Sequence, residues 1–205
     1  MDVDEQIIRG CMRYKRKSQQ KLWDLYAPLM KSICFRYARD MDEASDILQE
    51  GFLKVFLNIK KYQWKGSFEG WMKRVMVNTA INYYKKNQSN YYFEQIDEER
   101  TNEQEVDEQY EEDNAVDKMH ESDLKKDYNT VARAGFTEDE LMAALKTIPD
   151  HFRIVFSMSV LDGYKHKEIA GMLLIDEKTS RTRLLRAKKL LKNQLFEMSI
   201  KKLVK

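Results

Sequence analysis

The chain has 205 residues, of which 34% are charged and 42% apolar, and it contains only two prolines and seven glycines. The low proline and glycine counts disfavour a turn-rich β-sandwich and favour helices. Two cysteines, Cys11 and Cys34, exclude a disulfide framework and favour a reducing cytoplasm. The sequence has no secretory signal pattern at its start and no apolar run of about 18 residues, so an exported or membrane-spanning protein is not expected.

The formal net charge of +2 is the sum of three segments that alternate in sign. Residues 1–93 contain 17 basic and 10 acidic side chains, residues 94–127 contain 4 and 15, and residues 128–205 contain 15 and 9. The acidic segment has no tryptophan and few branched apolar residues, so it buries too little surface to offset the entropy of folding. We therefore predict an all-α protein with two small helical domains, residues 1–93 and 137–205, joined by an acidic flexible linker, residues 94–136.

The first domain contains two long amphipathic patterns. Apolar residues recur at spacings of three and four from Leu22 to Tyr37, and Pro28 predicts a kink or break in that helix. Asp42 is expected to cap the next helix, which runs to about Ile59 with one apolar side. Its other side carries acidic, amide and leucine side chains: Asp46, Gln49, Glu50, Leu53 and Leu57. This mixture favours a docking surface for a basic partner, and the alternative is an ordinary surface with stray leucines.

The next segment combines basic and aromatic side chains, a pattern typical of single-stranded nucleic-acid binding. A short loop from Lys60 to Gly66 precedes a long helix that Ser67 is expected to cap. Basic side chains neutralise phosphates, and aromatic faces stack on unpaired bases. The loop aromatics Tyr62 and Trp64 are the predicted stacking residues. The predicted basic contacts are Lys60, Lys61, Lys65, Arg74 and Lys85.

The second domain contains the elements of a helix-turn-helix. Thr137 and Glu140 predict a capping box for its first helix, and Pro149 fits the first turn of the second. The apolar positions of this second helix are expected to be Phe152, Val155, Phe156 and Val160. A third short helix, over about residues 165–173, is followed by a tight turn and a long helix that Asp176 is expected to cap.

The last helix has an apolar side, which includes Ser180, and a basic polar side. Its basic side is expected to enter the major groove, where Lys178, Thr182, Arg186 and Lys189 face the bases and flanking arginines hold phosphates. The full predicted set of duplex-contacting residues is Lys178, Thr179, Arg181, Thr182, Arg183, Arg186 and Lys189.

Each of the two predicted domains contains a set of short motifs. The motifs of the first domain are Asp46–Phe52, Phe68–Met72 and Asn78–Tyr83. The motifs of the second domain are Leu145–Pro149, Arg153–Phe156, Glu168–Ala170 and Thr179–Lys188. The two sets resemble region 2 and region 4 of the sigma-70 family of bacterial RNA polymerase sigma factors. The size of the chain and the direct succession of the two regions resemble the extracytoplasmic-function (ECF) group. Three positions depart from the family pattern, with Ser180 where valine is usual, Leu174 where glycine or asparagine is frequent, and Asn82 where aspartate is common.

The resemblance implies a transcription initiation factor of the cytoplasm that is not an enzyme and needs no cofactor or metal. Its partners would be core RNA polymerase, promoter DNA and, for many relatives, an anti-sigma factor. The acidic and leucine stripe would dock on the clamp helices of the large polymerase subunit, and the second domain would touch the flap. The loop from Lys60 to Gly66, with Asn78 and Asn82, would capture the melted −10 element, and the helix from Asp176 to Lys192 would read the −35 element.

Two other classes of protein fit the sequence less well. An enzyme is disfavoured, because the three histidines form no metal-binding pair and the chain has neither a P-loop nor a G-x-G-x-x-G motif. A helix-turn-helix regulator that binds duplex DNA alone stays open as the alternative. It accounts for the second domain, but it leaves the basic and aromatic loop and the stripe of residues 46–57 without a role.

Overall fold

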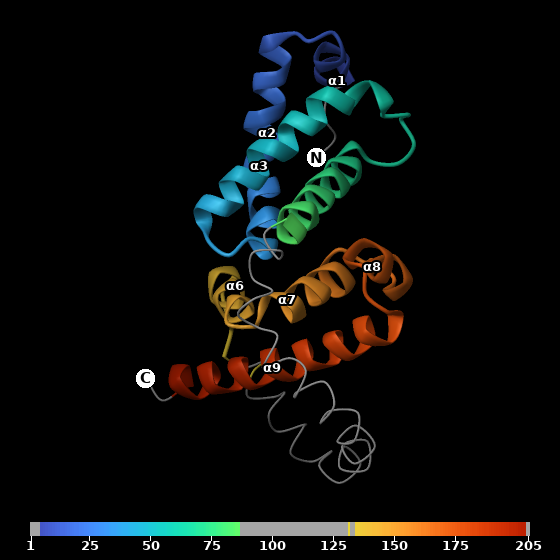
Figure 1. Cartoon of the computed structure of the whole chain (residues 1–205). Helices are drawn as coiled ribbons and strands as arrows, with labels where there is room; N and C mark the ends of the chain where they lie inside the picture. The colour runs from blue at the N-terminus through green and yellow to red at the C-terminus, as the bar shows by residue number, and fades with distance from the viewer. Residues whose placement is uncertain (1–4, 87–130, 132–133, 204–205) are drawn as a thin grey trace.

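The computed structural model describes residues 5–86, 131 and 134–203. The predicted acidic linker lies outside the described residues, except for residues 131 and 134–136. Every regular element in the described part is helical, and the elements form two groups that stack end to end (Figure 1). The first group consists of α1 (Glu5–Met12), α2 (Arg16–Tyr37), α3 (Met41–Asn58), η1 (Ile59–Lys61) and a helix over residues 68–86. The second consists of α6 (Glu138–Lys146), α7 (Asp150–Phe156), η2 (Ser157–Leu161), α8 (His166–Leu173) and α9 (Glu177–Leu203).

The long helix α2 packs against both α1 and α3 and provides much of the core of the first group. Its inward face follows the predicted spacing, with Leu22, Tyr26, Met30 and Ile33 buried. Of the kink or break predicted at Pro28, the break is wrong, because α2 continues through this residue, and the kink stays a prediction. Pro28 lies on the exposed side of the helix, where water can satisfy the carbonyl that proline leaves without an amide partner.

The start of α3 and its close packing are set by small local features. The cap is Asp40 rather than Asp42, and its carboxylate accepts a hydrogen bond of 2.8 Å from the Glu43 amide. Gly51 lets α3 approach the helix over residues 68–86, because a Cβ there would overlap the side chain of Met76. This close approach fixes the position of the loop that connects the two helices.

The second group confirms the predicted capping box, in which Thr137 and Glu140 bond reciprocally. The predicted phase of the next helix is partly wrong, since the buried positions include Ile154, Val155 and Met158, while Val160 is exposed. The burial of Met158 in place of Val160 follows from the π-helical turn η2, because the wider turn shifts the register of the side chains within and after it, whereas Ile154 is buried within α7 itself.

Helices α8 and α9 are joined by a tight turn in which Leu174 adopts a left-handed conformation with φ of 59°. Ser180 occupies a buried position at which valine is usual in the resembling family. Its hydroxyl lies 2.9 Å from His166 Nδ1, so the buried polar group has a partner. The last helix extends further than predicted, and its end is tied to α6 where Lys202 bonds to Glu140. None of the described helices has the length and apolar character needed to cross a membrane.

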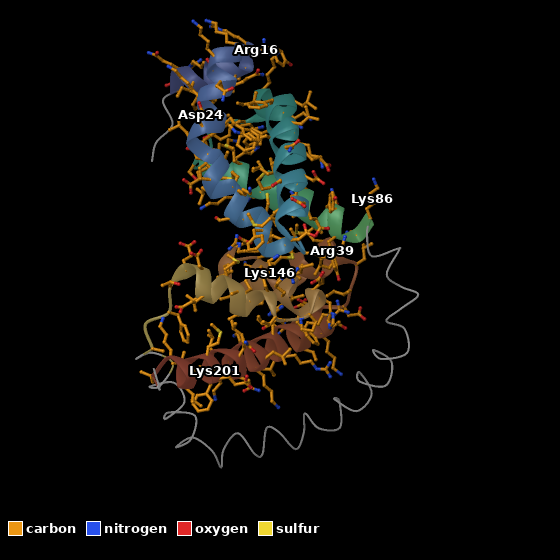
Figure 2. All side chains as sticks on the ribbon, turned by 90° about the vertical axis from the view of Figure 1, so that its left-hand side faces the viewer. Arg16, Asp24, Arg39, Lys86, Lys146 and Lys201 are labelled. Carbon is orange, nitrogen blue, oxygen red and sulfur yellow. The ribbon has the colours of Figure 1, made fainter. Side chains whose placement is uncertain are left out.

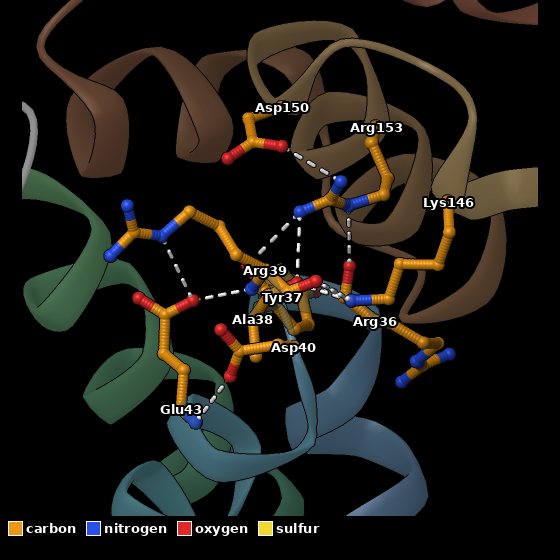
Figure 3. Close-up of polar contacts among 9 residues, drawn as sticks. All are labelled: Arg36, Tyr37, Ala38, Arg39, Asp40, Glu43, Lys146, Asp150 and Arg153. Atoms are coloured by element: carbon orange, nitrogen blue, oxygen red, sulfur yellow. Dashed lines mark hydrogen bonds and ion pairs between the residues drawn. The ribbon is translucent and has the colours of Figure 1, made fainter. Parts of the chain in front are cut away.

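The two groups meet where α2 ends and the last carbonyls of that helix receive cations from the second group (Figure 3). Arg153 is 2% exposed, and its guanidinium donates to the carbonyls of Arg36 and Ala38, each at 3.0 Å, and to that of Tyr37 at 3.4 Å. The final carbonyls of a helix lack intrahelical partners and carry partial negative charge, which explains why this end attracts a guanidinium.

Further contacts surround this point. The Lys146 ammonium donates to the Ala38 carbonyl and lies 4.0 Å from the centre of the Phe35 ring. Asp162 of the second group accepts from Arg36 at 2.6 Å and from the Tyr37 hydroxyl. Burial and the adjacent Asp162 carboxylate raise the pKa of Tyr37 well above its ordinary value, so the phenol remains a donor.

Candidate nucleic-acid interface

The outward face of α3 carries the predicted stripe of acidic and leucine side chains. Asp46, Gln49 and Glu50 are exposed, and Leu53 and Leu57 are 58% and 62% exposed. The opposite face of the same helix is buried. The prediction that this stripe faces outward is therefore confirmed, whereas its role in docking stays a prediction.

The loop between η1 and the next helix closes around Tyr62, contrary to the predicted role of that residue. Its ring is 7% exposed and packs against Phe68 and Trp71, with ring centres 5.1 and 5.8 Å apart. Its hydroxyl donates to the Gly66 carbonyl at 2.9 Å, and Gly66 has the left-handed φ of 80° that the turn requires. Tyr62 is thus a core residue that holds the loop in shape, and its predicted stacking on DNA bases is not compatible with this burial.

Trp64, by contrast, remains accessible at the surface of the loop. The side chain is 43% exposed, and its backbone has a left-handed φ of 60°. One of its neighbours is Tyr62, with ring centres 5.3 Å apart. Lys60, Lys61 and Lys65 are also exposed, so the loop retains one aromatic surface and three cations.

The helix over residues 68–86 begins as predicted, because the Gly70 amide donates to the Ser67 hydroxyl at 3.0 Å. Arg74, Asn78 and Asn82 recur at intervals of four residues, so they lie along one exposed side, and Lys85 is partly buried further along. Arg74 and Asn78 line an open cleft of about 1000 Å³ between the two helical groups, together with Asp162 and Tyr164. Part of the predicted −10 surface therefore faces the second group.

The basic face of α9 has the orientation expected of a recognition helix. Ser180 and Ala187 are buried on its inner side. Of the predicted duplex-contacting residues, Lys178, Arg181 and Lys189 are exposed, and Thr179, Thr182, Arg183 and Arg186 are partly buried. Arg181 forms an ion pair with Glu177 one turn earlier, and the Arg186 guanidinium lies 5.7 Å from the centre of the Phe152 ring. The face therefore presents several cations above a packed helical support.

His151 lies beneath this basic face and remains neutral near neutral pH. Burial is the larger cause and the nearby positive charges of Arg183 and Arg186 are the smaller one, and together they lower the pKa of His151 from 6.5 to about 4. An imidazolium at this site would add a third cation to two arginines, so the fold favours the neutral ring.

We expect acidification to destabilise the chain through His151. Because the pKa is lower in the folded state, the unfolded chain gains a proton first as the pH falls, so this contribution is complete above about pH 6.5 and is lost toward pH 4. The loss between pH 7 and pH 5 is about 2 kcal/mol. Urea unfolding of the native chain and of His151→Gln at both pH values measures the difference. An equal pH dependence in both proteins would contradict the assignment.

Two side chains outside the predicted set lie against the loop. Arg9 of α1 lies near Trp64, and Tyr14, which follows α1, lies near Lys60. Sequence patterns gave no signal for either residue, because the contacts arise from the packing of α1 against η1, about 50 positions away. In the part of the chain that the structure describes, no three His, Cys, Asp or Glu side chains are grouped so that they could hold a metal ion.

Charged side chains lie both at the outer ends of the molecule and where its two groups meet (Figure 2). Arg16 lies at the end of the first group that is remote from the second, whereas Arg39 and Lys146 lie where the two groups meet. Lys201 lies on α9 at the far side of the second group. The molecule therefore presents basic side chains at both of its outer ends.

Comparison with known proteins assigns both groups to one family. Residues 22–90 match the family model of Sigma-70 region 2, and residues 138–191 match that of Sigma-70, region 4. The ECF RNA polymerase sigma factor SigW of Bacillus subtilis (strain 168) is 24% identical over 208 residues, which cover 95% of this chain and the full length of that protein. The ECF RNA polymerase sigma-E factor of Escherichia coli (strain K12) is 24% identical over 184 residues, which cover 88% of this chain and 90% of the relative.

Among solved structures, the chain is similar to the sigma factor RpoE in complex with the anti-sigma factor NepR from Bartonella quintana. The TM-score is 0.48 with 14% identity, and the match covers 86% of this chain and 95% of the other. The two segments that match the family models span more than half of the sequence, and region 2 precedes region 4. The chain thus belongs to the sigma-70 family of RNA polymerase sigma factors, in the ECF group.

Proposed function

We propose that this sigma factor binds core RNA polymerase through the stripe on α3 and directs it to promoters through two DNA-contacting surfaces. The observation that carries the proposal is the exposure of Leu53 and Leu57 by 58% and 62% beside Asp46 and Glu50. Leucines that are largely exposed next to carboxylates suit a partner surface that is both apolar and basic. The polymerase contacts would be the clamp helices of its large subunit, with the flap in contact with the second group.

The DNA-contacting roles follow from the two basic surfaces. Trp64 and the lysines of the loop, with Arg74, Asn78, Asn82 and Lys85, would hold the melted −10 element, because an aromatic face stacks only on unpaired bases. Tyr62 would support this loop from within. The basic face of the N-terminal half of α9 would enter the major groove of the −35 element, where arginine and lysine recognise guanine and flanking cations hold phosphates.

The proposal also covers the setting in which the protein acts. A sigma factor enables a polymerase to recognise specific promoters and to open the promoter duplex. We therefore propose no catalytic reaction for this chain itself. Its place would be the cytoplasm, where the polymerase meets chromosomal DNA. An anti-sigma factor is included among the proposed partners because the family resemblance implies one.

In vitro transcription distinguishes this function from that of a regulator that acts alone. Core polymerase with the native chain should initiate at specific promoters selected from a DNA library, whereas Leu53→Asp with Leu57→Asp should abolish initiation and core binding. Leu25→Asp is the matched control, because Leu25 is an exposed leucine on a different helix, α2. Initiation that is independent of the chain, or unaffected by the double substitution, would favour the regulator.

We expect Arg186→Ala and Lys178→Ala to reduce discrimination at the −35 element and to leave core binding unchanged. Loss of a bidentate contact to one base costs about 1–3 kcal/mol, which corresponds to roughly a fivefold to 150-fold loss of preference. Competition between a selected promoter and its −35 variants measures the effect. Lys201→Ala is the control, because Lys201 is exposed on the same helix far from the basic face. Preserved discrimination in both variants would refute the assignment of α9.

A further inference from the structure

Two exposed aromatic residues of the first group occupy backbone conformations that favour glycine. Tyr14 has a φ of 56° and is 58% exposed, and Trp64 has a φ of 60° and is 43% exposed. A bulky residue in the left-handed region costs about 1 kcal/mol or more, whereas glycine adopts it freely. Folding alone would be served better by glycine at both positions, so the two aromatic rings point to a role at the surface.

The two rings are joined by reciprocal contacts between the N-terminal segment and the loop. The Arg9 guanidinium of α1 lies 5.4 Å from the centre of the Trp64 ring in the loop. In return, the Lys60 ammonium of η1 lies 4.6 Å from the centre of the Tyr14 ring that follows α1. Cations near ring faces are attracted to them, so these two contacts hold the N-terminal segment, with Tyr14, beside the loop that carries Trp64.

The surroundings of Tyr14 are strongly basic. Exposed cations flank it on both sides, and no acidic residue occurs between Glu5 and Asp24. The flanking cations are Arg13, Lys15, Arg16 and Lys17. This segment precedes residues 22–90, which match the region 2 model, so the family match assigns it no part. It also lies at the end of the first group remote from the second (Figure 1), and the cleft does not enclose it.

We propose that Tyr14 and Trp64, with the basic segment of residues 13–17 and Arg9, form a surface that extends the binding site for unpaired promoter DNA beyond region 2. Bases stack on the two rings, and the flanking cations contact the phosphates of the same strand. The assignment to single-stranded rather than duplex DNA follows from the rings, because bases within a duplex do not offer free faces. The inference rests on the proposed function and adds a segment to its −10 surface.

The test measures binding of the full-length native chain and of Tyr14→Gly to fluorescent single strands of roughly 20 nucleotides. Tyr14→Gly removes the ring and suits the left-handed backbone, so the variant should fold. Its affinity for oligo(dT) should fall by about fivefold or more, while its affinity for an abasic strand of equal length should not change. Tyr14→Phe should behave as the native chain, because stacking does not need the hydroxyl.

A second variant separates the phosphate contacts from the stacking. Arg13→Gln with Lys15→Gln should weaken binding of oligo(dT) and of the abasic strand equally, and it should reduce the dependence of affinity on salt. The inference is overturned if Tyr14→Gly binds oligo(dT) as tightly as the native chain does, or if the substitution weakens binding of the abasic strand as much as binding of oligo(dT). It is also overturned if the native chain does not bind oligo(dT), or if the native chain binds oligo(U) more tightly than oligo(dT).

The transcription assay with core polymerase keeps the two proposals apart. If the native chain supports initiation but Tyr14→Gly retains its affinity for oligo(dT), only the extended surface is wrong. If the native chain gives no initiation with core polymerase, the proposed function itself is wrong.

Discussion

Replacing Arg153 by methionine should separate the two helical groups. The buried guanidinium donates to three carbonyls at the end of α2 and pairs with Asp150 at 2.8 Å. Methionine fills similar space but donates nothing, so the carbonyls of Arg36 and Tyr37 would lose this donor and that of Ala38 would keep only Lys146. Loss of hydrogen bonds from a charged donor, with desolvated acceptors left behind, should weaken the packing of the groups by about 3 kcal/mol.

Small-angle X-ray scattering of the free chain measures this separation as an increase in the radius of gyration. Arg181→Met is the matched control, because it removes the same charge from an exposed site on α9. Circular dichroism should show that both variants keep their helices. An unchanged scattering profile for Arg153→Met would mean that the other contacts between the groups, among them those of Asp162 and Lys146, hold them together without this arginine.

The second large effect is expected at Tyr62. Truncation of this buried ring to alanine removes its contacts with Phe68 and Trp71 and its bond to the Gly66 carbonyl. The free energy of unfolding should fall by about 3–5 kcal/mol, as for other large aromatic residues in cores. Urea unfolding followed by far-ultraviolet circular dichroism measures the change.

Two companion variants separate the causes of that effect. Tyr62→Phe keeps the ring and loses only the bond to Gly66, so it should cost about 1 kcal/mol. Trp64→Gly removes the neighbouring ring from an exposed, left-handed position, and it should cost less than Tyr62→Ala. If Trp64→Gly were the more damaging change, Trp64 would be the core residue of the loop.

Features that depend on neighbours in sequence were predictable. The capping box of Thr137 and Glu140, the Ser67 cap and the outward stripe of α3 all arise from spacings within one or two turns. The exposed basic face of α9 was predictable for the same reason, since its 3.6-residue period is visible in the sequence.

Features that depend on distant partners or on subtle backbone choices were not predictable. Pro28 suggested a break, yet exposure of that side of α2 allows the helix to continue. The π-helical turn at residues 157–161 buries Met158 instead of the predicted Val160. The local composition gives no indication of such a turn. The position of Tyr62 in a loop predicts stacking on unpaired bases, but its ring is buried against Phe68 and Trp71 in the helix that follows. Arg153 belongs to a segment that resembles region 4, but its bonds to the end of α2 had no signal in the sequence, because the acceptors lie more than 100 positions away.

The position of Arg74 and Asn78 in the cleft has a consequence for how strongly promoters can be bound. In the proposed function these side chains hold the −10 element, and in the packed arrangement they line the cleft together with Asp162 and Tyr164. Only the molecules whose two groups are separated can then bind promoter DNA. Each 1.4 kcal/mol or so of packing energy therefore weakens the apparent affinity for the promoter about tenfold. Residues such as Lys146, which lie where the two groups meet, therefore help to set the free energy that binding of polymerase and promoter must supply to separate the groups.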